Sequence, residues 1–114
     1  MSSTDTGRKA EKAASTYLEM RGYRVLERNW RRPRCEIDII AEKGGTVYFV
    51  EVKYRRNDEQ GGGLEAITPT KLRQMRFAAA TWCDDTKWHG PSQLAAVELT
   101  GPDFTVMSFI DDVL

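Results

Sequence analysis

Apolar residues recur along this chain with two different periods, one typical of helices and one typical of strands. Residues 6–21 carry apolar side chains at helical spacing and Gly22 follows as a stop signal, so this segment is predicted to be a helix. A second helix is predicted to begin at Thr68-Pro69, a cap followed by a first-turn proline. The other apolar segments are predicted strands. They cover residues 23–30, 36–43, 46–53, 94–99 and 104–110.

The predicted order of elements is αβββαββ, which indicates an α/β fold with a mixed β-sheet flanked by helices. Residues 1–114 are expected to form a single domain, because a chain of this length buries one core without room for a second. Residues 31–34 are expected to form a loop. Residues 57–63 contain three consecutive glycines and are expected to form a loop that either contacts a substrate or is only a linker.

Two of the predicted strands carry acids and a lysine among apolar residues, on either side of the glycine pair at 44–45. Charged groups in such strands require a partner or a function. A two-residue turn at the glycine pair would place Asp38 opposite Glu51, and Glu36 opposite Lys53. The same register matches apolar residues with apolar residues, whereas a slip of one residue would set acids against apolar side chains.

Asp38 and Glu51, here called the acidic pair, would repel each other at a Cβ separation of about 5 Å. A divalent cation would turn this repulsion into binding, so both are predicted ligands of Mg²⁺ or Mn²⁺. The carbonyl of Val52 is a further predicted ligand, and Glu11, on the flank of the first helix's apolar stripe, could complete or orient the shell. Lys53 lies on the same strand face as Glu51 and could position or deprotonate a water molecule.

These groups together provide what phosphodiester hydrolysis needs, namely a metal site, an activated water and positive charge. Two plainer interpretations stay open. Glu11 would then be a solvated helix residue. Glu36 and Lys53 would belong to a cross-strand salt-bridge network, which leaves the acidic pair unexplained.

The composition excludes a globally basic surface, because 17 Lys and Arg residues balance 17 Asp and Glu residues. Basic residues instead gather in sequence on both sides of the acidic pair. Those predicted to bind nucleic acid are Arg28, Arg31, Arg32, Arg34, Arg55 and Arg56. The alternative is that they decorate solvated strand edges.

Cys35 and Cys83 lack the spacing of a metal or redox motif, and residues 1–6 lack the apolar core of a signal peptide. A cytoplasmic protein is therefore expected. No apolar run approaches the length of a membrane span, so no membrane partner is expected.

Five motifs along the chain form a specific set. They are Gly7-x-x-x-Glu11-x-x-Ala14, Leu18-x-x-x-Gly22-Tyr23, residues 26–31, residues 36–41 and Phe49-Val50-Glu51-Val52-Lys53-x-Arg55. As a set they resemble the YraN family, which is similar to archaeal Holliday junction resolvases and belongs with the restriction-endonuclease-like PD-(D/E)xK superfamily. The resemblance implies a restriction-endonuclease-like fold. It also implies that Glu11, Asp38, Glu51 and Lys53 match catalytic positions and that Lys71 faces phosphate.

The expected function is that of a metal-dependent endonuclease, or a nuclease-fold DNA-processing protein, that hydrolyses phosphodiesters. The resemblance implies branched DNA as substrate. The expected cofactor is Mg²⁺ or Mn²⁺, the expected partner is nucleic acid, specifically DNA, and a homodimer stays open. The alternatives are a non-catalytic nucleic-acid-binding module of the same fold and a protein-interaction adaptor, the latter supported by the neutral net charge.

Overall fold

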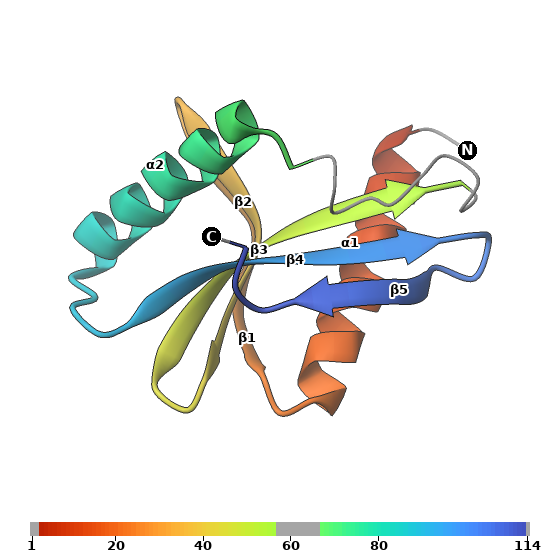
Figure 1. Cartoon of the computed structure of the whole chain (residues 1–114), viewed down its shortest axis with the longest axis horizontal. Helices are drawn as coiled ribbons and strands as arrows, with labels where there is room; N and C mark the ends of the chain where they lie inside the picture. The colour runs from red at the N-terminus through yellow and green to blue at the C-terminus, as the bar shows by residue number, and fades with distance from the viewer. Residues whose placement is uncertain (1–2, 57–66, 114) are drawn as a thin grey trace.

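The computed structural model describes residues 3–56 and 67–113, and its elements follow the predicted order αβββαββ (Figure 1). The helices are α1 (Ser3–Met20) and α2 (Pro69–Thr86). The strands are β1 (Arg24–Arg32), β2 (Cys35–Lys43), β3 (Thr46–Arg55), β4 (Ser92–Thr100) and β5 (Thr105–Ile110). The predicted glycine-rich loop at 57–63 lies outside the described residues. Neither helix, over the residues described, is long and apolar enough to cross a membrane.

β1 is longer than the sequence pattern predicts. Arg31 and Arg32, expected in a loop, continue the strand and pair with Glu36 and Cys35 of β2. The prediction of a loop over residues 31–34 is therefore wrong in its first half. The turn between the two strands shortens accordingly, which places both arginines at the end of the sheet.

The strands form one five-stranded sheet in the order β1-β2-β3-β4-β5. All neighbours are antiparallel except β3 and β4, which are parallel. A parallel neighbour requires a crossover connection, and α2 lies within it. The sheet is therefore mixed, as predicted. Residues 94–99 of β4 are all buried, as expected for a strand covered on both faces.

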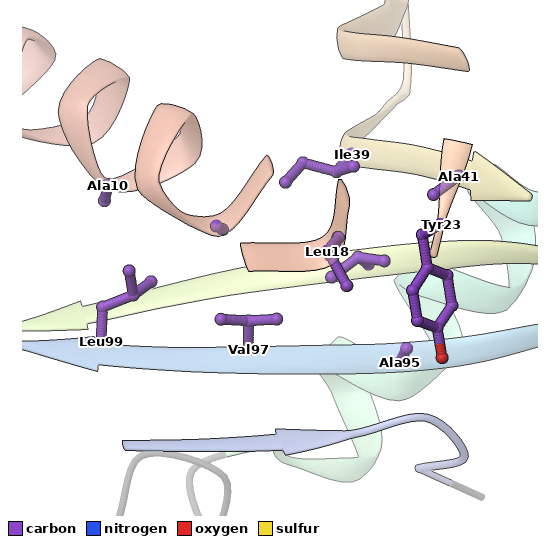
Figure 2. Packing of buried hydrophobic residues seen from close by; sticks show 10 residues of the cluster. Ala10, Leu18, Tyr23, Ile39, Ala41, Ala95, Val97 and Leu99 are labelled. Carbon is purple, nitrogen blue, oxygen red and sulfur yellow. The ribbon is translucent and has the colours of Figure 1, made fainter. Parts of the chain in front are cut away.

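α1 packs against one face of the sheet through small side chains (Figure 2). Ala10, Ala14 and Leu18 recur every four residues and are at most 2% exposed. They form one core cluster with residues of the central strands, including Ile39, Val50, Val97 and Leu99. Alanine leaves little side chain between the helix and the strands, so α1 lies close to the sheet and its flanking residues reach the strand ends.

α2 covers the opposite face of the sheet (Figure 1) with Met75, Ala78, Ala79 and Trp82. Thr68 caps the helix as predicted, because its Oγ1 accepts a hydrogen bond of 3.1 Å from the backbone N–H of Lys71. The indole Nε1 of Trp82 donates to Glu27 of β1 at 2.9 Å. The cap and the tryptophan fix the two ends of the helix, so the first-turn residue Lys71 has a defined place beside the sheet.

Leu18→Ala is expected to lower the free energy of unfolding by about 2–5 kcal/mol, because it empties a fully buried position between α1 and the sheet. Met20→Ala is the matched control on the same helix, since Met20 is 84% exposed. The control should change the free energy of unfolding by no more than about 0.5 kcal/mol. Urea unfolding followed by tryptophan fluorescence measures both, and an equal decrease in the two variants would contradict the packing described for α1.

Candidate active site

The β2–β3 hairpin has the predicted register and opens at the acidic pair. The two turn glycines at 44–45 have φ values of 60° and 84°. From this turn the ladder continues to Ile39 and Val50 and ends there. Asp38 and Glu51 are the next residues on the two strands, so the acidic pair lies where β2 separates from β3.

The Asp38 side chain satisfies the backbone at this opening. The N–H of Val52 donates a hydrogen bond of 2.8 Å to Asp38 Oδ2. Along a strand, successive residues point their backbone groups to opposite neighbours. The backbone N–H of Val47 donates a hydrogen bond of 3.1 Å to the carbonyl of Pro91, which precedes β4. Val52 is five residues further along β3, so its backbone groups point the other way, toward β2. The N–H and the carbonyl of one strand residue point to the same side, so the carbonyl of Val52 also faces the opening.

The acidic pair is an electrostatically strained arrangement. Burial, followed by the charge of Glu51, raises the pKa of Asp38 from 3.8 to about 8, although the hydrogen bond from Val52 acts in the opposite direction. Glu51 is only 12% exposed, and its Oε2 lies 3.0 Å from Nζ of Lys71 on α2. Near neutral pH the acidic pair therefore holds a proton that a bound cation would displace.

Glu11 reaches the same region from α1. Burial raises the pKa of its carboxyl, whereas a hydrogen bond with Asn29 and the charges of Arg28 and Arg31 lower it. The charge of Glu11 in turn contributes to the raised pKa of Asp38. The structure therefore brings Glu11 within electrostatic range of the acidic pair, from the opposite face of the sheet to Lys71.

Asn29 is a candidate site residue that the sequence pattern did not single out. Its φ is 55°, in the left-handed region that asparagine tolerates better than most residues with a side chain. The register on either side of Asn29 places it opposite Asp38. Asparagine is rare inside strands, so its presence in the middle of β1 was the available signal. Strained backbone of this kind often lies near functional groups.

The oxygen donors at the opening suit a hard divalent cation. Carboxylates, a backbone carbonyl and water are the ligands that Mg²⁺ and Mn²⁺ prefer. Within residues 3–56 and 67–113, no three His, Cys, Asp or Glu side chains converge on one point. Mg²⁺ is nevertheless commonly held by one or two carboxylates and several waters. The acidic pair and the Val52 carbonyl fit such an ion, with Glu11 nearby rather than in a cluster of three carboxylates.

Lys53 follows Glu51 by two residues on β3, so the two residues share a face of the sheet. The parallel register sets Lys53 beside Glu98 of β4. Its predicted cross-strand neighbour, Glu36, instead pairs with Arg31 at 3.4 Å. The expected pairing of Glu36 with Lys53 is not formed among the described side chains, because β2 has already left β3 at that position.

A cavity of about 380 Å³ lies beside the acidic pair, between the β1–β2 turn and α2. We call it the arginine cavity after the cations that line it, which are Arg31, Arg32, Arg34 and Lys71. Glu36 and Met75 line both this cavity and the small hollow at the acidic pair, so the two adjoin. Arg32 is held in place by Asp85 at 3.0 Å and by the ring of Trp30.

The other arginines predicted to bind nucleic acid lie elsewhere. Arg28 lines a different cavity together with Glu11. Nε of Arg55 lies 3.2 Å from Oε2 of Glu98, in an ion pair whose side chains are 22% and 10% exposed. Arg56 is exposed immediately after β3. The predicted basic residues therefore do not line one cavity, and among them only Arg31, Arg32 and Arg34, at the end of β1 and in the β1–β2 turn, share a cavity with Lys71.

The chain is similar in sequence to a group of bacterial proteins. The model of a family described as "Uncharacterised protein family UPF0102" matches residues 10–108. A UPF0102 protein of Leifsonia xyli subsp. xyli is 45% identical over 87 residues, which are 76% of this chain and 71% of the relative. One of Mycolicibacterium vanbaalenii is 43% identical over 88 residues, 77% of this chain and 73% of the relative. One of Chlorobium chlorochromatii is 44% identical over 81 residues, 71% of this chain and 63% of the relative.

The raised pKa of Asp38 predicts that the metal-free protein loses stability as the pH rises. The folded state binds the Asp38 proton more tightly than the unfolded state, so this stabilisation is complete below about pH 4 and is lost as the pH rises through about 8. Asp38→Asn mimics the protonated acid and should flatten this part of the profile. Urea unfolding in EDTA across that range measures the effect. Parallel profiles for the two proteins would contradict the raised pKa.

Proposed function

The chain belongs to the uncharacterised protein family UPF0102, the YraN family, and from its site we propose that it is a metal-dependent nuclease that hydrolyses phosphodiester bonds in DNA. The observation that carries this proposal is the acidic pair at the opening of the β2–β3 hairpin, adjoining a cavity lined by cations. A buried pair of like charges is costly to a fold unless something compensates it. A divalent cation would supply that compensation at the acidic pair, and a phosphate in the cavity would neutralise the cations that line it.

The acidic pair and the Val52 carbonyl are the groups that would hold Mg²⁺ or Mn²⁺. When bound, the ion supplies Lewis-acid polarisation of the phosphate and makes a water more acidic. The N–H of Val52 fixes Oδ2 of Asp38. The Asp38 carboxyl also forms a hydrogen bond with Glu51, and a bound cation would replace that contact. Glu11, which is hydrogen-bonded to Asn29, would orient the ligands of the ion at the edge of the site.

The lysines and arginines would act on the phosphate and the attacking water. The Lys53 amine would position this water or take its proton. The water oxygen forms a bond to phosphorus as the bond from phosphorus to the leaving oxygen breaks, and the leaving oxygen takes a proton from solvent. Arg31, Arg34 and Lys71 would bind phosphate oxygens in the arginine cavity and offset the negative charge that grows in the transition state. The resemblance to Holliday junction resolvases supports branched DNA as the substrate.

A nucleic-acid-binding module without turnover is the second candidate, and one contact favours it. The ammonium of Lys71 lies 3.0 Å from Oε2 of Glu51 and neutralises it. A protein that only binds DNA could keep this ion pair permanently. Measurements of metal binding and of DNA cleavage therefore distinguish the nuclease from the binding module.

We place this activity in the cytoplasm. Cys35 and Cys83 are both free thiols. Neither belongs to a metal-binding cluster in the part of the chain that the structure describes. Free thiols persist in a reducing compartment, which supports the assignment.

Calorimetry with Mn²⁺ tests the metal site. Wild-type protein should bind the ion, with an affinity that increases up to about pH 8 as the Asp38 proton is displaced. Asp38→Ala should lose binding, whereas Lys71→Gln should strengthen it by removing the ammonium that competes at Glu51. Asp103→Asn, in the exposed turn before β5, is the control. Equal affinities in wild type and Asp38→Ala would refute the site.

Cleavage assays distinguish the enzyme from the binding module. Lys53→Ala should retain Mn²⁺ and DNA binding but lower the cleavage rate by about 10²–10⁴-fold, because the Lys53 side chain is proposed to act on the attacking water chiefly in the transition state. Glu51→Ala should lose metal and cleavage together. Arg73→Ala, an exposed cation of α2 outside the arginine cavity, is the control.

The substrates for these assays should be duplex, single-stranded, flap and four-way DNA, each with Mn²⁺. A wild type that binds DNA and cuts none of them would favour the binding module. Trace cleavage that Lys53→Ala retains undiminished would instead indicate a contaminant and remove the proposed role of Lys53.

A further inference from the structure

A second cavity lined by cations lies beside α1. It measures about 490 Å³, and we call it the α1 cavity. Its lining residues are Arg8, Glu11, Lys12, Arg28 and Asn29. Arg8 and Lys12 are one helical turn apart, so they lie on one face of α1, next to Glu11. The lining carries more positive than negative charge, and its cations are exposed to solvent.

The α1 cavity and the arginine cavity lie on opposite faces of the sheet. The first is lined by residues of α1 and the second by residues of α2, and the two helices cover opposite faces. Glu11 connects them, because the charges of Arg28 from one cavity and Arg31 from the other both act on its carboxyl. Glu11 also interacts with Asp38. The carboxyl groups of the site are therefore flanked by positive charge on both sides.

We propose that the α1 cavity binds backbone phosphates of the nucleic acid, so that one DNA chain is held on both sides of the acidic pair. The inference rests on the proposed function, since it takes DNA as the ligand. It adds Arg8 and Lys12 as DNA-binding residues. The bound DNA strand would then run past Glu11, from one cavity to the other. A DNA strand that is held on both sides of the reacting bond is cut internally and not from an end.

The chemistry of the lining selects a polyanion over other occupants. None of the residues that line the α1 cavity is apolar, whereas a protein interface has an apolar core. The net charge of the chain is zero, so affinity for a polyanion has to come from local groups of cations such as this one. Phosphates spaced along a backbone can engage two separated cation groups at once, which a single small anion cannot.

DNA binding by matched variants tests this inference in EDTA, where metal-dependent cleavage cannot interfere. Arg8→Gln with Lys12→Gln removes two charges from the α1 cavity. Lys9→Gln with Arg73→Gln removes two charges from helix positions that line neither cavity. The first pair should make the dependence of log K on log salt less steep by about 0.9 for each phosphate of duplex DNA that the variant no longer neutralises. The control pair should leave the slope unchanged.

DNA with methylphosphonate linkages shows where the bound phosphates lie relative to the cut. Neutral linkages on either side of the preferred cleavage position should weaken binding by wild type. The Arg8→Gln/Lys12→Gln variant should become insensitive to neutral linkages on one side only, and Arg31→Gln/Arg34→Gln to those on the other side. If the wild type cuts no DNA, the same linkages are scanned along the oligonucleotide that it binds best.

The outcomes separate this inference from the proposed function. Cleavage by wild type together with an unchanged salt slope in Arg8→Gln/Lys12→Gln would overturn the inference and leave the nuclease intact. A reduced slope without any cleavage would support the α1 cavity and count against the nuclease. Absence of DNA binding by wild type even at low salt would overturn the inference. The single variant Arg8→Gln, with an expected slope change of about 0.9, serves if the double variant is unstable.

Discussion

The hydrogen bond from Val52 to Asp38 is the interaction on which the site depends. Where β2 leaves β3, the backbone groups of β3 that face β2 no longer have strand partners, and buried groups without partners are costly. The Asp38 carboxylate replaces the missing strand partner and so allows the sheet to open without that cost. An apolar residue at this position would leave the Val52 N–H unpaired and would remove one of the two acids. The same hydrogen bond therefore stabilises the opening and keeps a carboxylate inside it.

The topology of the sheet determines which charges meet at that opening. β3 is the strand at which the antiparallel part of the sheet meets the parallel part. The crossover between β3 and β4 brings α2 over the sheet, and the cap at Thr68 places Lys71 within reach of Glu51. α1 supplies Glu11 from the other face. Two acids from the sheet, one acid from α1 and one cation from α2 are thus assembled by one connection pattern.

Much of the fold could be predicted from the sequence, because periodicity and turn chemistry are local. The glycine turn and the matched apolar residues determined the hairpin register, and with it the place of the acidic pair. Local pattern does not show which residues from distant elements meet. The pairing of Arg55 with Glu98 depends on the parallel register, and the ion pair of Lys71 with Glu51 depends on the docking of α2. Lys71 was identified by resemblance alone.

The charged site shows the same division between local and distant information. Alternation places Lys53 on the face of Glu51, but it could not show that β2 departs before Glu36 reaches Lys53. The helical face shared by Arg8 and Lys12 with Glu11 was visible in the sequence. Their cavity was not, because it also requires Arg28 and Asn29 from β1. The backbone conformation of Asn29 is set by the sheet around it, so composition could indicate only that the residue is unusual there.

The ion pair of Lys71 with Glu51 would couple the two ligands proposed for the site, a cation and a phosphate. One ammonium carries a single positive charge, so it compensates Glu51 less well when it also binds a phosphate. A cation that binds Glu51 releases Lys71, and an anion that engages Lys71 leaves Glu51 uncompensated and more attractive to a cation. The two ligands would therefore favour each other's binding by the same factor, as thermodynamic linkage requires. A single side chain would in this way make the site cooperative, with neither ligand bound tightly until the other is present.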